Sequence, residues 1–136
     1  MRRFLIALLL VGACPRMAAS FPIMPRIADG GLVLTFRAGK WIGGAPHVNV
    51  IDIWEAADGK RGKLVCHVNR RTRVGSVEVR EWRYGEPIDG FDIEGCGTLE
   101  KGKLYGVTIV GPYGAGIARF ILAEDGSVRV VEHEGR

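Results

Sequence analysis

The sequence has no long hydrophobic run and little excess charge of either sign. A transmembrane helix needs about 20 consecutive apolar residues, and the longest run here, residues 4–13, is about half that length. The fractions of hydrophobic and charged residues, 47% and 25%, are those of a folded globular protein rather than of a disordered chain. A chain of 136 residues is long enough for one domain.

The N-terminal residues have the order of a secretory signal peptide. Arg2 and Arg3 precede the apolar run, and the small residues at positions 18–20 follow it as a cleavage site. Removal of residues 1–20 deletes three arginines and no acids, which leaves 16 basic and 15 acidic residues. A net charge near zero provides no concentrated positive surface for phosphates, so we expect no nucleic-acid partner. We expect an exported protein of the periplasm or the extracellular space.

Cysteine is scarce, and its positions suit an oxidising compartment. Cys14 lies within the signal, which leaves Cys66 and Cys96 in the mature chain. An even count in a small exported chain predicts one disulfide between them. The alternative is two separate buried thiols.

Cys14 has a second interpretation. Residues 10–14, Leu-Val-Gly-Ala-Cys, resemble a bacterial lipoprotein signal, in which a cysteine that becomes lipidated follows an aliphatic residue and two small ones. The resemblance implies lipidation of Cys14 and a protein tethered by its new N-terminus. Residues 18–20 supply a competing cleavage site that would release the chain.

Helical periodicity is also missing after residue 20, because apolar residues never recur at i, i+3, i+4 and i+7 over three turns. Short segments rich in Val and Ile, separated by turn residues, instead predict an all-β fold, a single small β-sandwich of seven or eight antiparallel strands with one disulfide. We expect residues 21–30 to be a flexible N-terminal segment and residues 31–136 to be the sandwich. The clearest hairpin turn is at residues 124–126. The expected strands are 32–36, 47–55, 63–69, 74–84, 91–94, 104–110, 117–122 and 128–131.

Alternation of apolar and polar residues predicts which faces are buried. In residues 47–55 the apolar parity changes between Val50 and Ile51. That change indicates a strand buried on both faces, or a bulge. We assign Trp54 to the core and Trp41 to its rim.

One local pattern sharpens the expected fold. Leu99, Gly102 and Tyr105 form the spacing Leu-x-x-Gly-x-x-Tyr. This pattern resembles the tyrosine corner of fibronectin type III and other immunoglobulin-like sandwiches, in which the Tyr hydroxyl bonds back to the preceding loop. Position 107 is Val where an immunoglobulin domain has its second core cysteine, so the resemblance over residues 96–131 favours the fibronectin-like variant. It implies a binding or spacer module and leaves the ligand open; the alternative is a glycine turn before an ordinary strand.

Motifs for catalysis are missing. His47, His67 and His133 are widely spaced and form no His-x-x-x-His pair. Cys66 is next to His67, but neighbours on a strand point to opposite faces and cannot share a proton. We therefore expect no enzyme, no cofactor and no metal site. A small secreted hydrolase would need a cleft in which a histidine and a carboxylate converge.

Charge is unevenly distributed along the mature chain. Residues 60–83 carry eight basic and two acidic residues, and residues 86–100 carry only acidic ones. The simplest interpretation is that the two sets neutralise each other across adjacent strands. The functional alternative is that Arg70, Arg71 and Arg73 form a hairpin tip that binds lipid head groups or an acidic glycan.

The acidic segment offers a second, weaker candidate. Asp89, Asp92 and Glu94 gather near a glycine turn, and calcium prefers several converging oxygens. Their spacing departs from the calcium-loop pattern, so a solvated acidic rim is the favoured interpretation.

Trp82 and Tyr84 are the candidate recognition residues. If the alternation that begins at Val77 continues, both aromatic side chains lie on a polar, solvent-facing side together with Arg80. Exposed aromatics beside Arg are typical of recognition surfaces, and aromatic planes also stack on sugar rings. The alternative is a bulge near Glu81 that turns Trp82 inward, or a loop that covers it.

These patterns predict an exported, non-catalytic binding or interaction module of the bacterial cell envelope. We expect its partner to be an envelope protein or a glycan, with membrane contact only through a lipid anchor or the basic loop. The alternatives are a glycan- or peptidoglycan-binding module that uses Trp82 and Tyr84, and a small secreted enzyme inhibitor.

Overall fold

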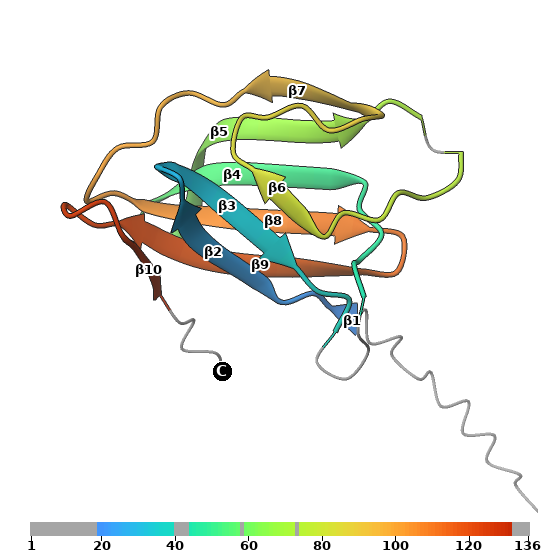
Figure 1. The fold of residues 1–136 in the computed structure, drawn as a ribbon, viewed down its shortest axis with the longest axis horizontal. Coiled ribbons are helices and arrows are strands. Elements are labelled where there is room, and N and C mark those ends of the chain that lie inside the picture. Colours follow the sequence, from blue (N-terminus) through green and yellow to red (C-terminus); the bar gives the residue numbers. More distant parts are fainter. Residues whose placement is uncertain (1–18, 40–43, 58, 73, 132–136) are drawn as a thin grey trace, which may run out of the picture.

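Two β-sheets packed face to face form the protein (Figure 1). The computed structural model describes residues 19–39, 44–57, 59–72 and 74–131. Sheet A consists, in spatial order, of β1 (Ala19–Ser20), β9 (Gly114–Leu122), β8 (Leu104–Gly111), β4 (Val50–Ala57), β5 (Lys60–Arg70) and β7 (Phe91–Gly95), and β10 (Val128–Val131) also pairs with β9. Sheet B consists of β2 (Ile23–Ala28), β3 (Gly31–Phe36) and β6 (Glu81–Arg83). All pairs are antiparallel except β1 with β9.

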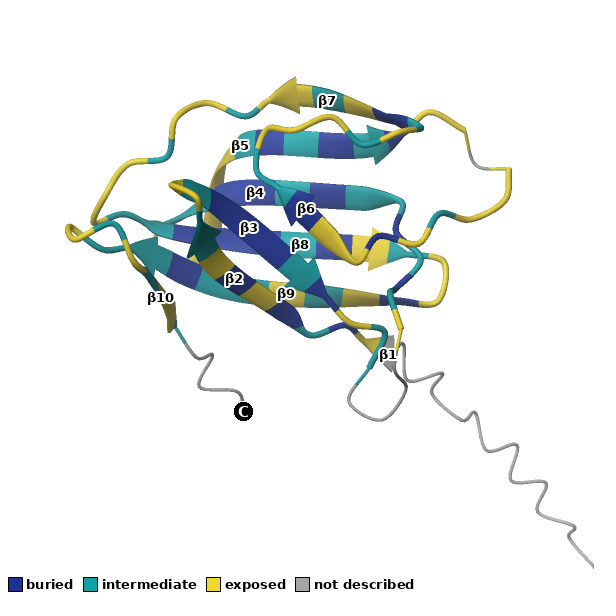
Figure 2. Cartoon of the chain, viewed as in Figure 1, coloured by how far each residue is buried: buried dark blue, intermediate teal, exposed yellow. Residues whose placement is uncertain are grey.

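The core lies between the sheets and follows the two-residue repeat of the strands. Ile51 and Ile53 of β4 belong to the same buried cluster as Val107 and Ile109 of β8 and Leu34 of β3. Figure 2 shows this repeat as alternating bands of buried and less buried residues along the strands of sheet A. The predicted all-β sandwich with one disulfide is confirmed.

The segment at residues 21–30 belongs to the sandwich, so the expected flexible segment is wrong. It contains β2, and Phe21 is buried in the core. Asp29 and Gly30 both have positive φ angles and form the two-residue turn between β2 and β3. An Asp-Gly pair is a preferred sequence for such a turn. Pro25 is tolerated because β2 is an edge strand, which pairs with β3 and with no other strand of the described residues.

The strand predicted at residues 74–84 is much shorter, since only β6 forms there. Val79 is buried, Arg80 and Glu81 are both exposed, and Trp82 is buried again. Two successive exposed residues break the alternation and turn Trp82 into the core. The inward orientation, one of the two alternatives, is therefore the one that the protein adopts.

Strand β4 is buried on both faces at one point. Val48 is buried but precedes β4, so the change of parity between Val50 and Ile51 marks the start of the strand. Further along, Ile53 belongs to the core between the sheets, whereas the neighbouring Trp54 lies on the opposite face of sheet A. The register between β4 and β5 shifts beside Trp54. Trp54 is thus buried, as expected, but outside the core between the sheets.

The tyrosine-corner pattern has the predicted local geometry. Tyr105 is buried near the start of β8, and its hydroxyl accepts a 2.7 Å hydrogen bond from the backbone N–H of Glu100. Gly102 has a φ of 80°, a conformation that glycine adopts without strain. The hydroxyl therefore bonds back to the loop that precedes its own strand.

Cys66 of β5 and Cys96, which directly follows β7, form the predicted disulfide. The bond joins two neighbouring strands at the edge of sheet A across a sequence separation of 30 residues. A disulfide is compatible with export, because oxidising compartments maintain such bonds. In the part of the chain that the structure describes, no helix is long and apolar enough to cross a membrane.

Removal of this disulfide should lower the free energy of unfolding by about 3–4 kcal/mol, because a closed loop of about 30 residues restricts the unfolded chain. Urea unfolding of the oxidised protein and of the Cys66→Ala/Cys96→Ala variant would measure the difference. As a control, a reductant that opens the disulfide should lower the stability of the wild-type protein and leave the stability of the double variant unchanged. Equal unfolding midpoints for the two proteins would contradict the expectation.

Candidate functional site

The two aromatic residues proposed for recognition do not form an exposed patch. Trp82 is 3% exposed, and its indole N–H donates to the backbone carbonyl of Glu86 at 2.8 Å. Tyr84 is partly buried, and its hydroxyl donates to the carbonyl of Gly97. The prediction that Trp82 offers a flat surface to a sugar is therefore wrong, because its ring lies in the core.

Arg70, predicted at a basic hairpin tip, has a structural role. Its side chain is buried, and its guanidinium donates to the side chain of Asn49 at 3.2 Å. It also donates to the carbonyls of Val74 and Gly75 at 3.0 and 2.9 Å. These bonds hold the segment that follows β5 against the sheet, so Arg70 is not available to an external anion.

Arg71 is exposed but already paired. Its Nε donates to the carboxylate of Asp92 on the neighbouring strand β7 at 2.8 Å. The predicted neutralisation between the basic and acidic segments is confirmed for this pair, whereas Arg73 lies outside the described residues. The acidic residues 89–94 form no metal-binding group.

The histidines occupy separate ion pairs. His67 donates through Nδ1 to the carboxylate of Asp52, and Nε2 of His47 lies 3.6 Å from the carboxylate of Glu78. His133 lies outside the described residues. Across the ranges that the structure describes, no three His, Cys, Asp or Glu side chains converge on one point.

A cavity of about 440 Å³ opens at the end of the sandwich where the β2–β3 turn meets the loop after β7. Apolar side chains dominate its lining, and Lys101 is its charged residue. Burial raises the pKa of Tyr84 in this lining to about 12, and the nearby Tyr105 adds to the shift. The cavity offers apolar contact rather than groups for a reaction. Its apolar lining residues are Ile27, Leu32, Leu99 and Leu122.

Many of the remaining polar side chains lie on one face of sheet A. We call this face, which points away from sheet B, the open face. The strand register aligns side chains of neighbouring strands in rows across this face. In the described chain, no strand packs against it. One row contains Glu94, His67, Asp52, Thr108 and Ile117. The next row contains Leu64, Trp54, Gly106, Arg119 and Val131.

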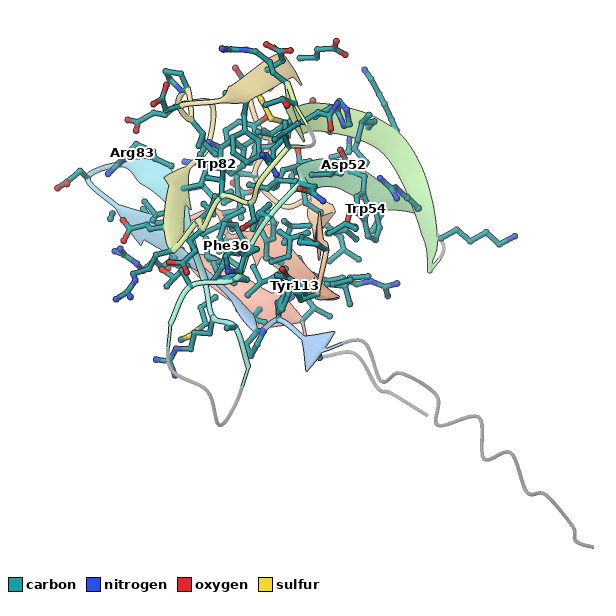
Figure 3. The ribbon with its side chains drawn as sticks, turned by 90° about the vertical axis from the view of Figure 1, so that its right-hand side faces the viewer. Phe36, Asp52, Trp54, Trp82, Arg83 and Tyr113 are labelled. Atoms are coloured by element: carbon teal, nitrogen blue, oxygen red, sulfur yellow. A yellow bond between two sulfur atoms is a disulfide. The ribbon has the colours of Figure 1, made fainter. Side chains whose placement is uncertain are left out.

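Asp52 holds the side chains of Arg61 and His67 on the open face. Its carboxylate accepts a hydrogen bond from His67 and a 2.9 Å bond from Nη2 of Arg61. The side chain of Asp52 is only 16% exposed, so solvent screens these contacts less than an ordinary surface ion pair. Figure 3 shows Asp52 and Trp54 on one side of the molecule and Arg83 of sheet B on the other.

Trp54 lies flat on β8 between two arginines and is only 2% exposed. The guanidinium carbons of Arg61 and Arg119 lie 5.8 and 5.9 Å from the centroid of its ring, which is the range of cation–π contacts. Gly106 makes this arrangement possible, because a Cβ atom at that position would lie 2.2 Å from Cζ2 of Trp54. The indole is thus held against the sheet from below and by the two arginines at its flanks.

Two hydrogen-bond donors in this cluster have no acceptor. The indole N–H of Trp54 and the Nε–H of Arg119 are buried and unpaired among the described residues. An unpaired buried donor costs about 1–3 kcal/mol. Arg119 also makes no ion pair in the described ranges, whereas Arg61 is neutralised by Asp52.

Exposed apolar side chains lie beside the cluster. Ile117 is 53% exposed and shares its face with Arg119, which follows it by two residues on β9. Val110 on β8 and Leu64 on β5 are each 47% exposed. Tryptophan and arginine are enriched in protein-binding surfaces, where Lys and Glu are depleted, and the exposed apolar side chains beside them would add apolar contact area.

Comparisons with family models, with curated proteins and with solved structures found no match to this chain. The geometry of the open face is therefore what bears on function. The Asp52–His67 pair orients an imidazole, but Thr108 lies across from Asp52 rather than beside His67. The arrangement suits surface binding better than nucleophilic chemistry, which requires a nucleophile within reach of the base.

Sequence reasoning missed this cluster because its members are far apart in the chain. Trp54, Arg61, Gly106 and Arg119 come from four strands, and only the register of β5, β4, β8 and β9 brings them together. Gly106 within an apolar strand was the available signal, since glycine in a strand often marks a place where another group approaches closely.

Replacement of Gly106 by alanine should displace Trp54 from β8. We expect Gly106→Ala to lower the free energy of unfolding by about 1–3 kcal/mol, as overpacking of a closed site does. Urea unfolding and the indole N–H resonance of Trp54 would report the change. Gly97→Ala is the matched control, because a Cβ there would meet nothing within 4 Å. Equal stability of the two variants would refute the proposed contact.

Stability should fall as the pH rises from about 10 to about 12, because an unfolded tyrosine ionises near 10 and Tyr84 in the folded protein near 12. The folded state then retains a proton that the unfolded state has lost, so the contribution is complete below about pH 10. Tyr84→Phe should reduce this loss and remove the late step in a tyrosinate absorbance titration. The exposed Tyr113 provides the control, since Tyr113→Phe should leave the late step in place.

Proposed function

We propose that this protein is an exported, non-catalytic binding module of the cell envelope, and that its binding surface is the open face of sheet A. The observation that carries the proposal is Arg119, which lies over the buried ring of Trp54, makes no ion pair with a described residue and stands beside the exposed Ile117. A protein partner is the class that fits, because Trp and Arg are enriched among the residues that contribute most to protein–protein affinity.

The rigidity of the open face supports this proposal. Its residues stand on central strands of a hydrogen-bonded sheet, not on loops, so a partner would meet side chains whose positions are already fixed. Binding to such a surface has little ordering entropy to overcome. The burial of Trp82 removes the exposed aromatic on which a glycan-binding interpretation depended.

The strand order supports an immunoglobulin-like class of the fibronectin type. In such sandwiches the first, second and fifth strands form one sheet, and the third, sixth and seventh form the other. Here β2, β3 and β6 form sheet B, and β4, β8 and β9 lie side by side in sheet A. The bond from Glu100 to Tyr105 at the start of β8 has the position of a tyrosine corner. Modules of this architecture are compatible with a binding role but do not specify a ligand.

Site-specific photo-cross-linking in intact cells tests the binding surface. A photoreactive residue at position 117, in place of Ile117, should give a cross-linked product of defined mass. The same residue in place of Met24 should give none, because Met24 is 52% exposed but lies on sheet B. Equal products from both positions, or none from position 117, would count against the open face.

A second substitution on the same face tests whether the product reflects affinity. Val110→Glu introduces a charge at an exposed position of β8 near residue 117 and should leave the thermal stability unchanged. We expect the yield of the cross-linked product to fall about fivefold, since an interface residue of moderate importance contributes about 1 kcal/mol. An unchanged yield would mean that the contact at position 117 is incidental.

A further inference from the structure

Positive charge on the open face is concentrated at the side formed by β9 and β10. Arg119 and Arg129 both lie there on the same face, with Arg129 opposite Ile121. The acidic residues of this face lie on β4 and β7: Asp52 pairs with Arg61 and His67, Asp92 pairs with Arg71, and the exposed Glu94 makes no ion pair with a described residue. Near the exposed Ile117, an incoming group therefore meets two arginines that make no ion pair with any described residue.

Arg119 differs from an ordinary surface arginine in how it is held. Its guanidinium carbon lies 5.9 Å from the ring centroid of Trp54, and its Nε–H is buried without an acceptor among the described residues. The indole N–H of Trp54, itself in a side chain that is almost completely buried, also lacks an acceptor. Two hydrogen-bond donors in one cluster thus have no acceptor among the described residues.

A carboxylate is the acceptor that fits these donors. The guanidinium fork of arginine binds a carboxylate through two parallel hydrogen bonds, and its fixed plane on an aromatic ring reduces the entropy lost on binding. Ile117 lies two residues before Arg119 on the same strand face, about 7 Å away. A ligand that contacts both Arg119 and Ile117 would carry a carboxylate and an apolar side chain about as far apart as these two residues.

We propose that Arg119 binds a carboxylate of an acidic segment of the partner protein, and that an apolar side chain of the same segment rests on Ile117. This inference rests on the proposed function of the open face and specifies the chemistry of its partner. A basic segment is disfavoured, because Arg119 and Arg129 would repel it. The guanidinium of Arg61 is already satisfied by Asp52 and has a supporting role in holding Trp54.

Charge reversal at Arg119 tests the proposed contact between Arg119 and a carboxylate, the carboxylate anchor, in cells. With the photoreactive residue at position 117, the cross-linked product should fall about tenfold or more in Arg119→Glu, and to a lesser extent in Arg119→Gln. Arg80→Glu is the matched control, because Arg80 is exposed and makes no ion pair in the described part of the chain. A product that persists in Arg119→Glu would overturn the carboxylate anchor and leave the binding module standing. No product from the wild-type chain would instead overturn the proposed function.

A titration that needs no cellular partner tests the anchor independently. Acetyl-Glu-Val-Glu-amide is added to isotope-labelled protein, and the resonances of the Trp54 indole N–H and the Arg119 Nε–H are followed. We expect saturable shifts of both signals, no shift with the corresponding Gln peptide, and no shift of the Trp54 signal in Arg119→Gln. Absence of shifts in the wild-type protein would overturn the inference. Equal shifts with sodium phosphate would overturn it in favour of a general anion site.

Discussion

Strand β4 serves two apolar layers at the same time. Its inward residues Ile51 and Ile53 belong to the core between the sheets, and its outward Trp54 packs on β8. Successive side chains on a strand point to opposite faces, so a single register with β5 and β8 fixes both layers. A slip of one residue would bring Asp52 into the core and place the isoleucines on the open face. The core and the open face therefore depend on the same pairing.

The outer layer is covered by polar side chains instead of a second sheet. The guanidinium groups of Arg61 and Arg119 lie over the ring of Trp54, and the residue is only 2% exposed. The open face thereby keeps a large aromatic side chain out of water in the free protein.

Local patterns in the sequence were sufficient to predict the sheet architecture but not to predict the contacts on the open face. The segments of alternating Val and Ile marked β3, β4, β5 and β8, and the turn at residues 124–126 correctly joined β9 to β10. Strand β2 was not predicted because it contains Pro25, a residue that is rare inside strands and is confined to edge strands when it occurs there. Trp82 was ambiguous because the break in alternation at Arg80 and Glu81 comes from tertiary packing, which no local rule reports. The contacts of Trp54 depend on strands that are distant in the chain, and only the assembled register reveals them.

The parallel pairing of β1 with β9 would make the sheet sensitive to any cleavage or modification of the N-terminal segment. Cleavage after residue 20 would remove β1 and leave Phe21 as the first residue, with its buried ring beside a new charged terminus. Lipidation at Cys14 would instead retain β1 and place the acyl chains at most about 18 Å from Ala19, even with the chain between them fully extended. Ala19 pairs with Gly114 at the β8–β9 turn, so that end of the sandwich would be held next to the bilayer.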